Sequence, residues 1–388
     1  MANLKNNVHA FEDKSNTDLL RAWILFKTIS NPIVSKFLTN LLQIALLFRL
    51  PINFLIKISI FKHFCGGENI EDCKNIIDKL WQSKIGSILD YSAEGKQTES
   101  DFKEVYNQAI KILETSKSNE KIPFIVFKFT GLIPFKILNK ISNKQELNSY
   151  EQKTYDLFIN RINLICKKAI KIKTPIFIDA EESWIQDAID KIVLSLMKKY
   201  NQKEVLVYNT LQMYRNDRIA YLNKTITVAK NEKFKLGFKL VRGAYHEKEI
   251  ARAKKNGYKT PVHLKKEDTD IDFNKSLEIC MSNIDIVSIC SGTHNVKSSE
   301  YLISLMKEKG VKNNDKRIFS SQLLGMSDNI SYNLSKEGYN VCKYVPYGPV
   351  REVIPYLIRR AEENRSISGQ MSRELQNIIS ERKRRKRA

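Results

Sequence analysis

Short β-prone runs recur eight times after residue 84, and most of them are followed by a long helical pattern. The runs span residues 87–92, 124–129, 175–178, 204–208, 235–241, 284–289, 317–320 and 340–345. Strands that alternate with helices pair in parallel and form a sheet covered by helices. Eight such units are the number that closes a (β/α)8 barrel of the TIM type. An open, doubly wound sheet also fits the alternation, but no G-x-G-x-x-G motif follows any run, which disfavours a dinucleotide-binding sheet.

The first 84 residues follow a different pattern. Apolar residues at three- and four-residue spacing predict helices over 18–30, 32–49, 51–63 and 70–84. We therefore expect a helical arm over 1–84 that packs on the barrel, a barrel over 85–370 whose last helix lies over the barrel mouth, and a basic tail over 371–388. Segment 18–61 is apolar and basic, and it either packs on the core or forms an amphipathic surface for lipid. Its uncharged stretch 37–48 is shorter than the about 20 residues of a membrane-spanning helix.

The chain is strongly basic. Its formal net charge is +22, and residues 382–387 form an unbroken run of Lys and Arg. A positive field favours nucleic acid, anionic lipid or an acidic small molecule, although a charge block on its own is typical of a solvated tail. No nucleic-acid-binding motif is present, so we expect no nucleic-acid partner.

Cysteine usage and the start of the chain bear on the compartment. The six cysteines are scattered, with no C-x-x-C pair, and no secretory signal is present. The sequence therefore predicts free thiols, no metal site and a cytoplasmic location, with peripheral contact to the inner face of the cytoplasmic membrane as a further expectation.

Polar side chains stand at nearly every predicted strand end. They include Asp90, Lys128, Asp179, Gln212, Arg242, Thr293, Gln322 and Tyr344. The carboxyl ends of barrel strands meet at one mouth, and buried polar groups cost several kcal/mol if unpaired, so a lined ligand cavity explains them better than packing. There is no Ser–His–Asp set, and His294 has no second histidine on a neighbouring strand end. The remaining amides, hydroxyls and charges suit a bulky cofactor that carries the chemistry.

A charged cluster follows the last predicted strand. Arg359 and Arg360 are adjacent on a predicted helix, and Glu363 shares their side because it lies four and three residues later. Two guanidiniums can each hold a carboxylate through two hydrogen bonds. The alternative is a solvated, charged surface helix.

Several motifs occur in a fixed order over residues 85–366. They are D-A-E at the third strand, K-L-V-R-G-A-Y at the fifth, T-H-N at the sixth, Q-L-L-G-M at the seventh, K-Y-V-P-Y-G-P at the eighth, and then R-R-x-x-E-N. In this order they resemble the proline dehydrogenase family, flavin enzymes built on a (β/α)8 barrel. One departure is His246, where some relatives carry tryptophan beside the flavin edge.

The resemblance implies a cofactor site and a substrate site. FAD would lie over the C-terminal mouth of the barrel, with contacts from Asp179, Ala180, Gln212, Lys239, Val241, Arg242, Gly243, Ala244, Thr293, His294, Asn295 and Gln322. The implied substrate-binding residues are Lys128, Leu324, Tyr344, Arg359 and Arg360. The implied catalytic residues are Lys128, Tyr344, Arg359, Arg360, Glu363 and Tyr245. The arginines and Lys128 would hold the proline carboxylate, Glu363 would order the arginines, and the tyrosines would wall the ring.

The resemblance also implies a reaction and partners. The reaction is oxidation of L-proline to 1-pyrroline-5-carboxylate by hydride transfer to flavin N5, the first step of proline catabolism, with a membrane quinone as electron acceptor. The product would pass to a separate pyrroline-5-carboxylate dehydrogenase. The alternative is a flavoenzyme of the same fold that oxidises hydroxyproline or another cyclic amino acid.

Overall fold

A computed structural model describes residues 4, 9–12, 14–48, 50–92, 97–366 and 368–387. It describes the side chains of all of these except 32, 36, 43–47, 362–366 and 368–373. No described helix is both long enough and apolar enough to cross a lipid bilayer.

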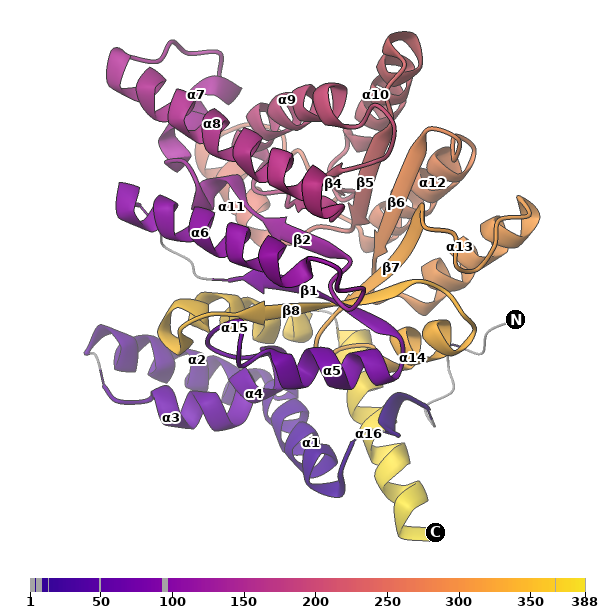
Figure 1. Ribbon diagram of the computed structural model, residues 1–388. Helices are drawn as coiled ribbons and strands as arrows, with labels where there is room; N and C mark the ends of the chain where they lie inside the picture. The colour runs from indigo at the N-terminus through magenta and orange to yellow at the C-terminus, as the bar shows by residue number, and fades with distance from the viewer. Residues whose placement is uncertain are drawn as a thin grey trace.

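Eight parallel strands close into a barrel, which confirms the predicted (β/α)8 fold (Figure 1). The strands are β1 (Ile85–Tyr91), β2 (Phe124–Phe127), β3 (Ile176–Ile178), β4 (Val207–Gln212), β5 (Leu236–Val241), β6 (Val287–Gly292), β7 (Ile318–Leu323) and β8 (Val341–Tyr347). Each strand pairs with the next along the chain, and β8 pairs with β1 over the whole of both strands. Because the barrel is closed, it leaves no unpaired sheet edge.

Helices connect successive strands and surround the barrel. They are α6 (Glu99–Ser116), the 3-10 turn η3 (Phe129–Gly131), α7 (Phe135–Ser142), α8 (Ser149–Ile172), α9 (Ser183–Tyr200), α10 (Arg218–Glu232), α11 (His246–Asn256), α12 (Lys266–Met281), α13 (Val296–Glu308), α14 (Asp328–Lys336) and α15 (Val350–Ser366). Local sequence sets their starts: Thr98 and Asn148 form capping boxes with Asp101 and Glu151 at α6 and α8.

Side-chain alternation divides the barrel interior into two layers. Phe124 and Phe177 stack with ring centroids 4.2 Å apart, and Tyr208 and Phe319 meet the Phe124 ring edge-on, so aromatic rings fill the lower layer. Successive strand residues point to opposite faces. Two residues after Phe177, the chain therefore presents Asp179 on the same side, nearer the carboxyl ends of the strands.

Two strands begin later than predicted. The runs 204–208 and 284–289 give way to β4 and β6, which begin at Val207 and Val287. The Asn201 side chain accepts hydrogen bonds from the backbone N–H groups of Leu206 and Val207, so the residues before β4 form a loop. Residues 282–286 form turns before β6. The apolar side chains of Leu206, Ile284 and Ile286 pack on the main hydrophobic core.

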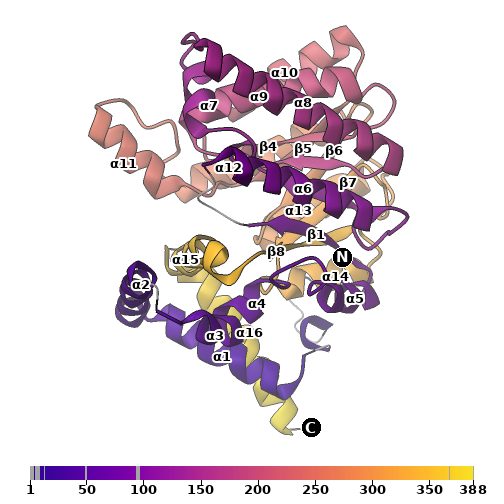
Figure 2. The ribbon, with the colours of Figure 1, turned by 60° about the vertical axis from the view of Figure 1, so that its left-hand side comes forward.

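A second hydrophobic core lies beside β8 and outside the barrel. It is built from the N-terminal helices, α15 and the last helix; its members include Phe26, Phe61, Val353, Leu357 and Ile378. The N-terminal elements are η1 (His9–Phe11), α1 (Asn16–Ser30), α2 (Pro32–Leu47), α3 (Asn53–Ile56), the π-helical η2 (Lys57–Phe61), α4 (Lys62–Phe64) and α5 (Lys74–Gln82). In both overall views α1, α3, α15 and α16 lie together on one side of the barrel, and we call them the helical layer (Figures 1 and 2).

The end of the chain differs from the prediction. The last described helix is α16 (Ser368–Arg387), and not α15, because residues of the predicted basic tail form a helix that packs on α1. Arg385 of α16 donates a hydrogen bond to the carbonyl of Phe11, 374 residues earlier in the chain. The helix that follows β8 and carries Arg359 and Arg360 is α15. The boundaries at residues 84 and 370 stay predictions.

Candidate active site

A charged triad joins Asp179, just after β3, to Lys239 of β5 and Tyr344 of β8; Lys239 and Tyr344 are buried and Asp179 is half-buried. The Lys239 ammonium donates hydrogen bonds to the Asp179 carboxylate and, over 2.5 Å, to the Tyr344 hydroxyl. It also lies 4.5 Å from the centre of the Tyr344 ring. Burial raises the pKa of Tyr344, with the Asp179 charge adding to the effect, so this hydroxyl stays protonated. The structure thus joins three predicted site residues that are far apart in sequence.

Asp90 and Lys128 extend this triad around the mouth. Asp90 is a buried carboxyl at the end of β1 that accepts a hydrogen bond from the Ser92 hydroxyl over 2.8 Å. Burial raises its pKa, while the nearby Lys128 and Lys239 cations lower it. Sequence reasoning noted Asp90 at a strand end but assigned it no role. Alternation along β1 could have found it, since it lies two residues after the interior Ile88.

The tip of β5 carries exposed, nearly bare backbone. Gly243 and Ala244 are exposed, and Gly243 has φ of 142°, a conformation that L residues rarely adopt. A Cβ on Gly243 would meet the Tyr214 ring at 2.5 Å, so glycine is required here by the protein itself. The Ala244 N–H donates to the Gln212 side-chain oxygen over 2.9 Å, which ties β5 to β4.

Arg242, next to that tip, is held from three sides. Its Nε donates to Asp270 over 2.6 Å, and its two terminal nitrogens donate to the Thr293 and Ser298 hydroxyls over 2.5 and 2.9 Å. Its guanidinium lies over the Phe273 ring at 4.5 Å. Burial lowers the pKa of Arg242, and the Asp270 charge opposes this effect. The guanidinium is therefore fixed in place before any ligand arrives.

The ends of β6 and β7 are tied together in the same way. Gln322 donates to the carbonyl of Thr293 over 3.1 Å, and His294 lies 3.1 Å from the Ser327 hydroxyl. The Asn295 side chain caps the first turn of α13. The T-H-N run is therefore a fixed turn, and its Thr293 hydroxyl lies against Arg242. Of the other predicted cofactor contacts, Ala180 is buried and Val241, the last residue of β5, is half-buried.

Tyr245 and Glu181 connect the β5 tip to the substrate side. Burial raises the pKa of Tyr245, and the cations of Lys128 and Arg359 lower it, so both cations act at this hydroxyl. Burial also raises the pKa of Glu181 to about 7, although hydrogen bonds from the Thr130 hydroxyl and N–H lower it. Sequence reasoning assigned Glu181 no role; its place in the D-A-E run after β3 was the available signal.

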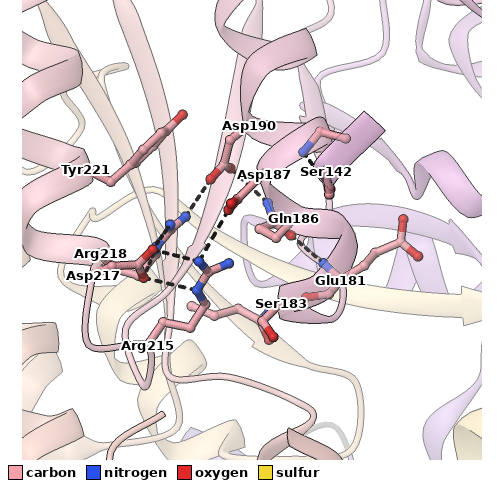
Figure 3. Close-up of polar contacts among 12 residues, drawn as sticks. Ser142, Glu181, Ser183, Gln186, Asp187, Asp190, Arg215, Asp217, Arg218 and Tyr221 are labelled. Carbon is pink, nitrogen blue, oxygen red and sulfur yellow. Dashed lines mark hydrogen bonds and ion pairs between the residues drawn. The ribbon is translucent and has the colours of Figure 1, made fainter. Parts of the chain in front are cut away.

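A buried polar network supports the loop after β3 from behind (Figure 3). The Glu181 N–H donates to the Gln186 side chain over 2.8 Å, and Gln186 donates in turn to Asp190 over 2.9 Å. Asp190 forms an ion pair with Arg218 over 2.6 Å, and both side chains are buried. Gln212 holds the Glu181 carbonyl over 2.8 Å. Sequence reasoning missed Gln186, Asp190 and Arg218 because they are helix residues without a motif.

Helix α15 carries the predicted substrate arginines, and the Arg359 cation acts at the Tyr245 hydroxyl. Arg360 is buried and lies 5.2 Å from the centre of the Tyr356 ring, and Arg359 is half-buried. The Glu363 side chain lies outside the described residues. Leu324 is buried, and its N–H donates to the carbonyl of Tyr344 over 2.9 Å, so the predicted apolar wall adjoins the triad.

The site therefore combines two chemical halves. Around β5, exposed backbone and a fixed guanidinium offer a surface for a flat, anionic group. Between Lys128, Tyr344 and α15, cations and tyrosines suit a small carboxylate with an apolar body. No side chain among the described residues is arranged with a partner as an activated nucleophile here, so the residues bind and orient rather than attack.

Comparison with known proteins points to one family. A family model described as proline dehydrogenase matches residues 73–373. Proline dehydrogenase 1, mitochondrial, of Dictyostelium discoideum is 31% identical over 97% of this chain and 74% of that protein. Hydroxyproline dehydrogenase of Xenopus laevis is 27% identical over 97% of this chain and 88% of that protein.

Solved structures agree on the fold. The crystal structure of proline utilization A (PutA) from Bdellovibrio bacteriovorus inactivated by N-propargylglycine has a TM-score of 0.72 and is 16% identical. It covers 96% of this chain, and this chain spans only 40% of that one. At this identity the likeness supports the barrel architecture alone.

Proposed function

Because this chain belongs to the proline dehydrogenase family, a family of oxidoreductases, we propose that it oxidises L-proline to 1-pyrroline-5-carboxylate with FAD as cofactor. The observation that carries this proposal is the Lys239–Asp179–Tyr344 triad at the barrel mouth, together with the Arg359 cation of α15 that acts at the Tyr245 hydroxyl. Electrons would leave to a membrane quinone, at the inner face of the cytoplasmic membrane. A pyrroline-5-carboxylate dehydrogenase would consume the product.

The donor set at the mouth fits FAD. The bare backbone of Gly243 and Ala244 leaves room for a flat ring system, and the fixed Arg242 guanidinium beside Thr293 and His294 suits a phosphate group. The residues that would hold FAD are Asp179, Ala180, Gln212, Lys239, Val241, Arg242, Gly243, Ala244, Thr293, His294, Asn295 and Gln322. When bound, FAD would supply the acceptor for the hydride that leaves the ring carbon next to the proline nitrogen.

The chain's own residues would orient the substrate. Arg359, Arg360 and Lys128 would hold the carboxylate, and Tyr245, Tyr344 and Leu324 would enclose the ring and exclude water. The substrate amine must be neutral, so that its lone pair forms the new C=N bond as the hydride leaves. Its N–H proton is released, and no strong protein base is needed at the carbon. Positioning and charge pairing are therefore the protein's main contributions.

The first test is optical. Purified protein should absorb as an oxidised flavoprotein, and the absorbance should bleach when L-proline is added without air. A colourless preparation that binds no added FAD, or a flavin that L-proline leaves oxidised, would contradict the proposal.

The second test separates substrate binding from cofactor binding. Arg359→Met and Arg360→Met each remove a charged hydrogen-bond donor, which is worth roughly 1.5–3 kcal/mol. We expect each to raise the KM for L-proline about tenfold to a hundredfold. Arg351→Met is the matched control, because Arg351 is exposed on the same helix and contacts Asn53 and Leu50 of the N-terminal region. Unchanged proline affinity in both arginine variants would refute the proposed clamp.

A second candidate substrate is hydroxyproline. One relative is named hydroxyproline dehydrogenase and matches nearly the whole chain. An added ring hydroxyl would need a polar partner in a wall that Leu324 and Tyr344 make largely apolar. We therefore expect L-proline to have the higher kcat/KM, and parallel measurements on both substrates decide it.

A further inference from the structure

Large apolar side chains are exposed on the N-terminal helices. Twelve of the twenty exposed large apolar side chains among the described residues lie between residues 20 and 58. The most exposed are Ile33 at 81%, Phe48 at 69%, Phe54 at 68% and Phe37 at 65%. Soluble monomers rarely expose such a concentration of apolar surface unless it binds something.

In helix α2 polar side chains face the protein and apolar side chains are exposed, the reverse of an ordinary surface helix. It buries Ser35 and half-buries Thr39, whose hydroxyl donates back to the carbonyl of Ser35 over 2.9 Å. On its other side it exposes Ile33, Phe37 and Leu41, at the four-residue spacing of one helix face. The apolar face of α2 is therefore directed away from the protein.

Basic residues predominate in these helices. Residues 19–67 contain six Lys or Arg and no Asp or Glu. The basic end of α16 lies against α1, since the Arg382 guanidinium is 5.0 Å from the Trp23 ring centre (Figure 2). Lys383, Lys386 and Arg387 remain exposed there. Two acids lie nearby, and both are paired: Glu68 with Lys57, and Glu381 with Arg384 and Arg385. An apolar surface with a mainly basic surround is complementary to anionic lipid headgroups over an acyl phase.

We propose that α2, α3 and the basic end of α16 form a docking face for an anionic bilayer. The apolar side chains of α2 and α3 enter the boundary between headgroups and acyl chains, and the α16 cations meet the headgroups. Because α15 packs directly on α2 and α3, docking brings the candidate substrate site beside the lipid phase that dissolves a quinone. The link to a quinone rests on the proposed function, and the docking itself does not.

The test is sedimentation of the full chain with lipid vesicles. We expect binding to vesicles of phosphatidylcholine with phosphatidylglycerol, and weaker binding to phosphatidylcholine alone or at high salt. The triple variant Ile33→Ser, Phe37→Ser, Phe54→Ser should bind at least about tenfold more weakly. The control Tyr150→Ser, Leu264→Ser, Ile271→Ser removes equally exposed apolar side chains elsewhere and should bind normally. Replacing Lys383, Lys386 and Arg387 with Gln should reduce the salt dependence.

Three outcomes would overturn the proposal. In the first, the wild-type chain binds neither kind of vesicle. In the second, the N-terminal triple variant binds vesicles as tightly as the wild type does. In the third, no vesicle binding occurs and the wild-type chain is a dimer that this variant converts to monomer, so that a second copy of the chain occupies this face. Reduction of a water-soluble dye by L-proline, measured on the same variants, keeps the two proposals apart. Normal dye reduction with lost vesicle binding supports docking, whereas a failure of dye reduction in every form counts against proline oxidation only.

Discussion

The barrel and the helical layer hold opposite sides of the candidate site, and they are built in different ways. In the barrel each strand pairs with its neighbour in sequence, and the triad of Lys239, Asp179 and Tyr344 follows from alternation along those strands. In the helical layer, α15 is held by helices from the two ends of the described chain, α1 and α16. The helix that carries Arg359 and Arg360 thus depends on a hydrophobic core separate from those of the barrel.

The same substitution in each core gives the largest expected effect and tests this separation directly. Phe177→Ala removes a buried ring inside the barrel, and Phe26→Ala removes one from the helical layer. Each should lower the free energy of unfolding by about 3–5 kcal/mol. We expect the first variant to bind less flavin per chain, and the second to keep its flavin while its KM for L-proline rises. Parallel losses in both variants would show that the cores act as one.

The two regions should also respond to pH with opposite sign, beginning with the barrel. Burial raises the pKa of Glu181 to about 7 from an ordinary value of 4.5. Between these values the folded chain keeps a proton that the unfolded chain loses, so the free energy of unfolding falls as pH rises from 4.5 to 7, by at most about 3 kcal/mol. The side chain of Glu181→Gln cannot titrate, so the free energy of unfolding of this variant should rise relative to that of the wild type as pH rises from 4.5 to 7. Urea midpoints of both proteins, compared over that range, check it.

The second hydrophobic core, where His63 of α4 packs against Phe26 and Phe64, should lose stability on the acid side. Burial lowers the pKa of His63 to about 4 from 6.5, and its Nε2 lies 2.9 Å from the carbonyl of Gly325. Here the unfolded chain takes up the proton first, so stability falls as pH drops from 6.5 to 4, by about 2 kcal/mol for this partly exposed ring. His63→Gln should unfold with less acid dependence than the wild type. If the variant's free energy of unfolding falls with acid as steeply as the wild type's, groups other than His63 cause the loss of stability.

The smallest effect is expected behind the loop after β3. Gln186→Leu leaves the buried Glu181 N–H without its acceptor and should cost about 1–2 kcal/mol. Because Gln186 supports the cofactor side, flavin affinity should fall more than proline affinity. Gln202→Leu, at an exposed position just beyond α9, is the control and should change neither. A larger effect on proline affinity would contradict the division of roles between the two cores.

The strand ends show how far sequence reasoning reached. Alternating strands and helices predicted eight units because both patterns are local, and polar residues after each run predicted a lined mouth. The later starts of β4 and β6 were missed, because the apolar residues before Val207 and Val287 look like strand but lie in a loop and turns and pack on the main hydrophobic core. Only a long-range contact, such as Asn201 holding the N–H groups of Leu206 and Val207, distinguishes the two.

By itself the sequence determined the barrel, the identity of the residues at its mouth and the motif that carries Arg359 and Arg360, since each is written in neighbouring residues. Tertiary structure alone decided that residues of the basic tail form a helix on α1, that Glu181 is buried behind Thr130, and that α2 turns its apolar side outward. These features depend on contacts between segments far apart in sequence, from the 51 residues between Thr130 and Glu181 to the 374 between Phe11 and Arg385. No local sequence pattern encodes whether an apolar helix face will pack on the protein or stay exposed.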